Sequence, residues 1–408
     1  MRLLHTADWH LGDRLGRIDR TEDLRRAVER IAALCSDERI DALIVAGDLF
    51  SELARPDGLR DAVLHLRDTF DGFLRAGGTI LAVTGNHDNE TFCQTLRHAM
   101  NLAAPPPGDR RRPAQPGRLY LAAEPTLLRL ADRTGEFAVQ FALMPFPTPT
   151  VFLSGDAARQ YESLGDKNSR LRAAFLDRLA DLRRDPHFRH DEPSVLVAHV
   201  GVQGAELNSR FRISETEDVV VDPASWPGQF AYVALGHIHK AHAVGGCATV
   251  RYSGSIERLD LGESGDEKSV TLVDLDASGR ARIETRAIEA TPIYRVEVTD
   301  PLAELPDLPR RYPDHESALV NLRFSYDARR DNLLDLQRRF DAAFPRWYAR
   351  DFYNRNDGPA FALPESSTAR HFDAVVLEYL RDQLVHESDE EQRALFTLAE
   401  QYLHSIDH

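Results

Sequence analysis

Five short motifs before residue 240 contain side chains that bind cations. They are Asp8-Trp9-His10, Gly47-Asp48, Gly85-Asn86-His87-Asp88, His199 and Gly236-His237-Ile238-His239. Their carboxylate, amide and imidazole groups form a donor set of nitrogen and oxygen atoms without a thiolate. Such a set suits manganese, iron, zinc or related divalent ions.

The mixture of ligand types favours two cations rather than one. A carboxylate has two oxygens and can bridge two cations, whereas each imidazole offers one lone pair to one cation. One bridging aspartate with histidine and asparagine on either side predicts two cations about 3.5–4 Å apart, which bind phosphate oxygens and activate water for in-line displacement. Each motif alone has an ordinary explanation as a turn or a buried histidine. Their combination indicates a catalytic metal site.

The motifs follow apolar segments that have the length and composition of β-strands. We expect strands at 2–5, 42–46, 79–84, 139–144, 195–199, 232–235 and 270–275. Between the second and third of these, 59–74 repeats its apolar residues with helical spacing. This alternation predicts an α/β domain with βαβ units over residues 1–285. Open α/β sheets build their sites at the carboxyl ends of strands, where these motifs lie.

The chain beyond residue 285 predicts two further parts. Alternating apolar residues at 294–298 and 320–326, with helical spacing at 333–340, indicate a small α+β module over 290–353. Residues 354–364 form a linker pattern, and 365–408 are helical in pattern throughout.

Composition excludes several classes of protein. The 408 residues suggest two or three domains. The three cysteines are far apart, which excludes a cysteine-based zinc site and argues against a disulfide framework. No apolar run reaches the roughly 18 residues of a membrane span, and no secretory signal is recognisable, so the cytoplasm is the default compartment. The net charge is −15, and 365–408 contribute 3 − 10 = −7 of it. We assign no function from charge, because cations bound by a carboxylate cluster change its local sign.

The ordered motifs resemble the signature of the calcineurin-like metallophosphoesterases. The surrounding segments are similar to the bacterial SbcD family, the nuclease subunits of SbcCD DNA repair complexes. These segments read MRLLHTADWHLG, DALIVAGDLF, YVALGHIHKAH and VRYSGSIERLDLGESGDEKSV. The resemblance covers about residues 1–280. It implies a four-layer metallophosphoesterase sandwich, followed by a small α+β capping domain that faces DNA and a helical C-terminal tail.

The resemblance also implies a role for each site residue. The first metal would be bound by Asp8, His10, Asp48 and His239. The second would be bound by Asp48, Asn86, His199 and His237, with Asp48 as the bridge. The family suggests that both are Mn²⁺. His87 would lie beside the pair and stabilise charge or protonate the leaving oxygen, and Asp88 would orient its imidazole. Ser51 stands where archaeal relatives tend to carry a histidine linked to DNA-end handling.

The resulting functional expectation is a metal-dependent DNA exonuclease and endonuclease of DNA repair, recombination and replication. It would act on double-strand ends, hairpins and single strands as a dimer, with an SbcC-like coiled-coil ATPase as its partner. The alternatives are a phosphomonoesterase or cyclic-nucleotide phosphodiesterase with the same metals, and a scaffold that retains metals but mainly tethers a partner. The extra domains argue against a small substrate, and the intact ligand set argues against the scaffold.

Two segments outside the metal motifs suggest contacts with macromolecules. Arg210, Phe211 and Arg212 interleave arginine with an aromatic ring, which suits a DNA backbone or an unstacked base, although a loop with one packed Phe is an equal alternative. In the tail, Phe372, Val375, Val376, Tyr379 and Leu380 form one apolar stripe of a helix. The resemblance implies that 365–408 dock to the ATPase, and the acidic surroundings of the stripe favour a basic partner surface. The alternative is packing on its own domain.

Overall fold

Two six-stranded sheets form the centre of the first domain in the computed structural model. The first contains, in order, β16 (Ala281–Ala287), β15 (Ser269–Leu275), β1 (Arg2–Thr6), β4 (Ala42–Ala46), β5 (Thr79–Val83) and β6 (Leu119–Ala122). The second contains β13 (His242–Ala243), β14 (Val250–Tyr252), β12 (Tyr232–Gly236), β9 (Ser194–His199), β8 (Ala138–Met144) and β7 (Thr126–Ala131). The neighbours β1, β4, β5 and β6 run parallel, and β15 is antiparallel to β1. Each of the seven expected strands is present, and its bounds differ by no more than one residue at either end.

The structure describes residues 1–104, 112–155, 160–206, 218–224, 226, 228–355 and 395. The tail at 365–408 therefore lies, except for Leu395, outside the described residues. The chain from Met1 to Phe352 is one unit, and a second unit starts at Tyr353. Within the described part, no helix has the length and apolarity required to cross a bilayer.

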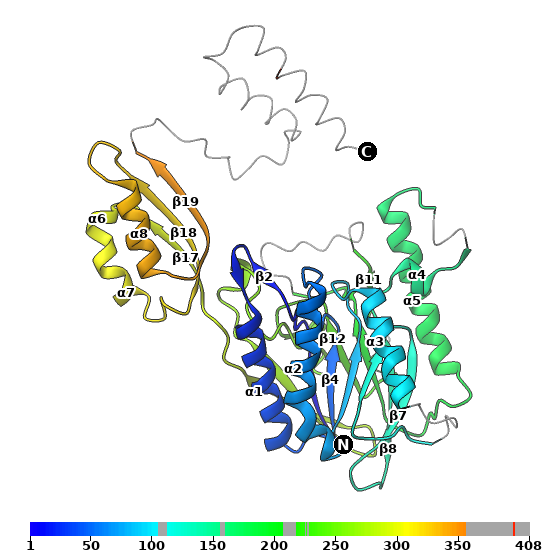
Figure 1. Ribbon diagram of the computed structural model, residues 1–408. Coiled ribbons are helices and arrows are strands. Elements are labelled where there is room, and N and C mark those ends of the chain that lie inside the picture. The colour runs from blue at the N-terminus through cyan, green and yellow to red at the C-terminus, as the bar shows by residue number, and fades with distance from the viewer. Residues whose placement is uncertain are drawn as a thin grey trace. The chain divides into compact units, whose positions relative to one another are not determined.

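Helices cover the outer faces of both sheets, so the domain has four layers (Figure 1). α1 (Thr21–Asp37), α2 (Pro56–Arg75) and α3 (Glu90–Ala103) pack on the first sheet, and α4 (Pro149–Phe152) and α5 (Leu164–Arg184) pack on the second. A third apolar core, which includes Ile44, Leu81 and Val197, fills the space between the sheets. Strands buried on both faces read as continuous apolar runs, which is why the sequence revealed them. The expected metallophosphoesterase sandwich is confirmed.

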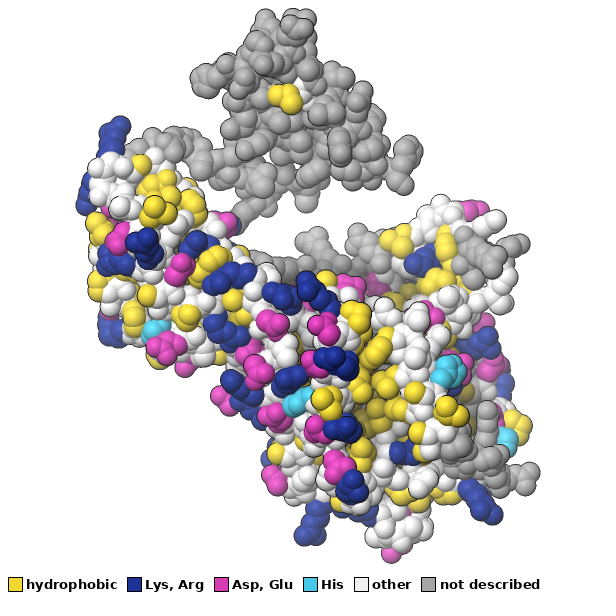
Figure 2. Space-filling view, in the orientation of Figure 1, with side chains coloured by type: hydrophobic (Ala, Val, Ile, Leu, Met, Phe, Trp, Pro, Cys, Tyr) yellow, Lys and Arg dark blue, Asp and Glu magenta, His cyan; other side chains and the backbone are white. Residues whose placement is uncertain are grey.

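One outer surface of this domain exposes apolar side chains. Figure 2 shows hydrophobic side chains gathered around a hollow in the region of α2 and α3. Val63 and Leu66 on α2, and Leu96 and Met100 on α3, are only partly buried against the core below them. We call these four residues the α2–α3 apolar face.

A smaller module follows the sandwich and has a core of its own. It contains β17 (Ile293–Val298), β18 (Leu319–Tyr326) and β19 (Trp347–Asn354) in one sheet, with α6 (Pro301–Glu304), α7 (Leu308–Arg311) and α8 (Leu333–Ala343). β17 and β18 are parallel, so the chain crosses over between them through α6 and α7. Phe324 and Phe340 stack at 4.5 Å between ring centroids in the core of this module.

The small module contacts the chain directly after the first metal motif. There, the short strands β2 (Arg14–Leu15) and β3 (Ile18–Asp19) form a hairpin. Its Arg17 donates hydrogen bonds to the carbonyl oxygens of Trp347 at 2.8 Å and Pro345 at 2.9 Å. The Arg17 guanidinium also lies 3.8 Å from the centroid of the Trp347 ring. These contacts hold the module next to the hairpin that follows His10 in the chain.

Candidate metal centre

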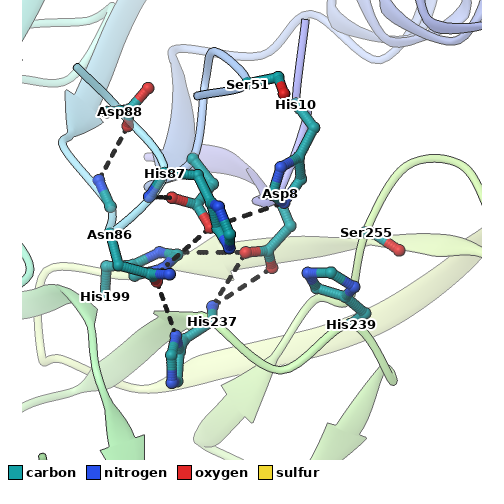
Figure 3. Close-up of polar contacts among 12 residues, drawn as sticks. Asp8, His10, Ser51, Asn86, His87, Asp88, His199, His237, His239 and Ser255 are labelled. Atoms are coloured by element: carbon teal, nitrogen blue, oxygen red, sulfur yellow. Dashed lines mark hydrogen bonds and ion pairs between the residues drawn. The ribbon is translucent and has the colours of Figure 1, made fainter. Parts of the chain in front are cut away.

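The expected ligands converge at the carboxyl ends of strands from both sheets (Figure 3). Asp8 and His10 follow β1, Asp48 follows β4, and Asn86 follows β5, which are neighbours in the first sheet. His199 ends β9, and His237 and His239 follow β12 in the second sheet. The site therefore exists only where the edges of two sheets meet.

The backbone at the site adopts a conformation that most residues avoid. Among the described residues, five non-glycine residues have a positive φ, and four are ligands of the expected site. Their φ angles are 54° at Asp8, 49° at His10, 51° at Asp48 and 103° at His237. Such conformations cost about 1–3 kcal/mol each and persist where the surrounding structure enforces them, typically at functional sites.

The glycines of the motifs allow the two sheets to approach closely. A Cβ atom at Gly47 would collide with the His199 imidazole, and one at Gly236 would collide with the Ala46 carbonyl oxygen. Gly47 also has a φ of 95°, which favours glycine. Glycine is therefore required beside Asp48 and His237 if these ligands are to meet.

Asp48 lies between histidines of the two expected metal positions. Its Oδ2 is 3.5 Å from Nε2 of His10 and 3.3 Å from Nε2 of His199. Its Oδ1 accepts a hydrogen bond of 2.9 Å from the backbone N–H of His87. Asp48 is 1% exposed. One carboxylate oxygen between two imidazole nitrogens is the arrangement expected of a bridging ligand.

The first position groups Asp8, His10 and His239. One donor atom from each lies within 4.8 Å of the others. Nε2 of His10 is buried and has no hydrogen-bond partner among the described residues, although an unpaired buried polar atom is costly. A cation between His10 and the carboxylates of Asp8 and Asp48 would satisfy this atom.

The second position groups Asn86, His199 and His237. Oδ1 of Asn86 is 3.0 Å from Nε2 of His199 and 3.0 Å from Nδ1 of His237. Nδ1 of His199 donates to the carbonyl oxygen of Ala46 at 2.7 Å. Neutral His199 therefore carries its lone pair on Nε2, which faces the oxygens of Asn86 and Asp48. Three electron-rich atoms in contact require a shared proton or a cation.

Carboxylates around His199 and His239 favour the protonated form of both imidazoles. Burial opposes the charged form of His199, but the Asp48 and Asp8 carboxylates outweigh it and raise the pKa of His199 to about 9. Burial also opposes the charged form of His239. The Glu263 and Asp8 carboxylates outweigh burial and raise the pKa of His239 to about 9. Burial lowers the pKa of His10 to about 3; the Asp48 carboxylate opposes this shift, and the neighbouring histidines add to it. Cations would displace the protons of His199 and His239 on binding.

His87 lies beside the ligands, and its imidazole is 35% exposed. The centroid of its ring is 5.0 Å from that of His10, and its Nδ1 is 3.5 Å from the Glu52 carboxylate. The exposed ring is accessible to a substrate bound over the cluster. Glu52 was not identified from the sequence, although it lies four residues after Asp48 of the Gly47-Asp48 motif.

Asp88 does not orient His87, and that expectation is wrong. Its carboxylate accepts hydrogen bonds from the backbone N–H groups of Gly85 at 2.8 Å, Phe50 at 2.8 Å and Leu49 at 3.2 Å. Figure 3 shows it directed away from the His87 ring. Asp88 instead joins the loops that carry Asp48 and Asn86, a role that a buried carboxylate can perform for unpaired backbone donors.

Two carboxylates that the sequence did not reveal contact the ligand histidines. Oδ2 of Asp218 is 2.5 Å from Nε2 of His237, and Oε1 of Glu263 is 2.9 Å from Nδ1 of His239. Glu263 belongs to the family-like segment VRYSGSIERLDLGESGDEKSV, which was a usable signal. No local pattern marks Asp218.

Two other expectations concern residues outside the proposed ligand set. Arg210, Phe211 and Arg212 lie outside the described residues. Ser51 is buried, and its hydroxyl donates to Oδ1 of Asp13 at 3.0 Å. Ser51 thus supports the chain after His10 rather than facing the ligands.

Comparisons with known proteins identify the family of the chain. Residues 1–241 match the family model of the calcineurin-like phosphoesterases. The chain is 31% identical to SbcD, a component of the SbcCD nuclease, from Rhodobacter capsulatus, over 76% of this chain and 78% of the relative. It is 28% identical to SbcD from Escherichia coli K12, over 75% of this chain and 70% of the relative. It is 27% identical to the DNA double-strand break repair protein Mre11 of Aeropyrum pernix, over 73% of this chain and 63% of the relative.

Replacing Asp48 by alanine tests the bridge. We expect Asp48→Ala to abolish binding at both positions, because its carboxylate is the only group proposed to serve both, whereas Asn86→Ala should weaken mainly the second. Titration calorimetry with Mn²⁺ gives the number and affinity of the sites. Asp41→Ala is the control, since Asp41 precedes β4 at its opposite end. Two sites of normal affinity in Asp48→Ala would show that Asp48 is not the bridge.

Proposed function

The chain belongs to the calcineurin-like phosphoesterases and, within them, to the SbcD nuclease subunits; from this premise we propose that it hydrolyses DNA phosphodiester bonds at a site for two divalent cations. The observation that supports this most strongly is the position of the Asp48 carboxylate between His10 and His199. A site for a single cation would require only one group of ligands beside this carboxylate, whereas candidate ligands lie in two groups around it.

The donor set fits two cations that accept nitrogen and oxygen ligands, and we propose Mn²⁺. Asp8, His10 and His239 would hold one, Asn86, His199 and His237 the other, and Asp48 both. When bound, such a pair neutralises phosphate oxygens and lowers the pKa of water to near neutral. The remaining chemistry falls to His87, which is close enough to the cluster and exposed enough to donate a proton to the leaving oxygen.

A DNA substrate accounts for features that a small phosphate ester would not require. The module over β17–β19 is fixed through Arg17 to the hairpin that follows His10. A long substrate lying across the site would extend past this hairpin and meet the module. We therefore propose that the module positions DNA, as the capping domain of the family would.

Hydrolysis assays with purified protein and Mn²⁺ test the substrate. We expect cleavage of hairpin, blunt-ended and single-stranded DNA, because the chain belongs to the SbcD nuclease subunits and carries a second module joined to the hairpin after His10. Nitrophenyl phosphate and a cyclic nucleotide serve as small substrates in parallel. Hydrolysis of these without cleavage of any DNA would favour the phosphomonoesterase or cyclic-nucleotide phosphodiesterase and contradict the nuclease.

The variant His87→Ala separates catalysis from metal binding. We expect it to keep both Mn²⁺ sites and to lose turnover by about 10²–10⁴-fold, the usual contribution of a positioned proton donor. The measurements are Mn²⁺ stoichiometry and the rate of DNA cleavage. His187→Ala is the matched control, because His187 has a similar exposure of 34% and also pairs with a carboxylate. Loss of a Mn²⁺ site in His87→Ala would identify His87 as a ligand instead.

Residues 365–408 are proposed to bind the base of a coiled coil in an SbcC-like ATPase. The support is the apolar stripe in the sequence, its acidic surroundings and the relationship to SbcD. Deleting 365–408 should abolish co-purification with the ATPase but leave Mn²⁺-dependent cleavage of single-stranded DNA, since all ligands precede residue 240. A truncated protein that binds its partner normally contradicts the proposal. One that no longer folds indicates that the tail packs on its own domain.

A homodimer is proposed through the α2–α3 apolar face. Leu66 and its three companions leave apolar surface partly open on adjacent helices, and a second copy would bury it. We expect sedimentation of the unmodified protein as a dimer and of Leu66→Glu as a monomer. Leu176→Glu, at an exposed leucine of α5, is the control. A monomeric unmodified protein, or a dimeric Leu66→Glu that unfolds at the normal temperature, would contradict this interface.

A further inference from the structure

Each histidine of the Gly-His-Ile-His motif forms a hydrogen bond with a carboxylate from another segment of the chain. Nε2 of His237 contacts Asp218 at 2.5 Å, and Nδ1 of His239 contacts Glu263 at 2.9 Å. We propose that Asp218 and Glu263 are positioning residues, each of which sets the cation affinity of a different metal position. This inference rests on the proposed two-cation site and adds which residues control each half of it.

The physical basis is the choice of tautomer. A carboxylate accepts the N–H of one ring nitrogen, so the lone pair of a neutral imidazole is placed on the other nitrogen. For His237 the remaining nitrogen is Nδ1, which lies 3.0 Å from Oδ1 of Asn86 in the second position. For His239 it is Nε2, and this histidine groups with Asp8 and His10 in the first position. The two histidines thus use opposite nitrogens because their carboxylates lie on opposite atoms.

Glu263 is itself fixed in place. It is 2% exposed, and its Oε2 accepts from Nζ of Lys268 at 2.5 Å and from Oγ of Ser255 at 3.0 Å. Lys268 also donates to the carbonyl oxygen of His239 at 3.0 Å. One buried lysine therefore holds both the carboxylate and the backbone of the histidine that the carboxylate orients.

Asp218 acts from a separate part of the structure. It directly precedes Val219, whose backbone N–H it accepts at 2.7 Å, and its side chain is 20% exposed. The Phe146 ring also lies beside His237, 5.7 Å away between centroids. The carboxylate and the ring together restrict the orientation of this imidazole. Asp218 and Glu263 contact different histidines through different ring nitrogens, so their effects should separate by position.

The experiment measures each position alone. Asn86→Ala leaves mainly the first position, and His10→Ala leaves mainly the second. In the Asn86→Ala background, removing Glu263 should weaken Mn²⁺ binding about 10–100-fold, the usual cost of losing such a partner, while Asp218→Ala changes nothing. In the His10→Ala background the effects should be exchanged. The readout is Mn²⁺ affinity by titration calorimetry, which does not depend on turnover.

Removing Glu263 alone would leave Lys268 buried without its partner, so the variant is Glu263→Ala with Lys268→Met. Glu263→Gln and Asp218→Asn retain an oxygen acceptor and should restore part of the affinity. Glu257→Gln is the matched control for Glu263, because Glu257 is equally buried and pairs with Arg20 instead of a histidine. Asp185→Asn is the control for Asp218, because it pairs with His187 outside the site.

The possible outcomes test the positioning roles of Asp218 and Glu263 separately from the proposed two-cation site. Selective loss at the expected position, with partial restoration by the amide variants, supports both. Equal loss at both positions, or loss that follows the unfolding temperature and also occurs in Glu257→Gln, reduces the two carboxylates to structural residues and overturns the inference alone. Failure of the unmodified protein to bind Mn²⁺ overturns the inference together with the proposed site.

Discussion

The candidate metal site is organised around one buried carboxylate. Asp48 is held within 3.5 Å of two imidazole nitrogens that belong to different groups of ligands. Its neighbours Asp8 and Asp88 are also buried, and burial raises the pKa of both carboxyl groups. Three carboxylates this close repel one another unless positive charge lies among them. The Asp48 and Asp8 carboxylates accordingly raise the pKa of His199 to about 9, and the same place suits divalent cations.

Both sheets are needed to build this arrangement, and it requires unfavourable backbone conformations at several candidate ligands. The second sheet brings His199 and His237 against the first, and Gly47 and Gly236 are the points of closest approach. Asp8, His10, Asp48 and His237 are held at positive φ. The continuous apolar core between the sheets stabilises the strand ends enough to maintain these conformations. Ligand geometry is thus a consequence of the packing of the sandwich.

The sequence was informative where a pattern of residue types has a single physical explanation. Strands buried on both faces could be located to within a residue, and the candidate ligands could be predicted because carboxylate, amide and imidazole groups follow these strands. The edge strands β6, β7 and β16 were not identified, since partly exposed strands lack a continuous apolar run. Asp218, Glu263 and Glu52 were missed because they meet the histidines only through the fold. Asp88 was misassigned because proximity in sequence to His87 does not determine which atoms its carboxylate contacts.

Anomalous diffraction from crystals soaked in Mn²⁺ tests the central claim most directly. The account predicts two peaks about 3.5–4 Å apart, with the Asp48 carboxylate in contact with both. One peak should lie against Asp8, His10 and His239, and the other against Asn86, His199 and His237. A single peak, or two peaks of which only one contacts Asp48, would contradict the two-cation site.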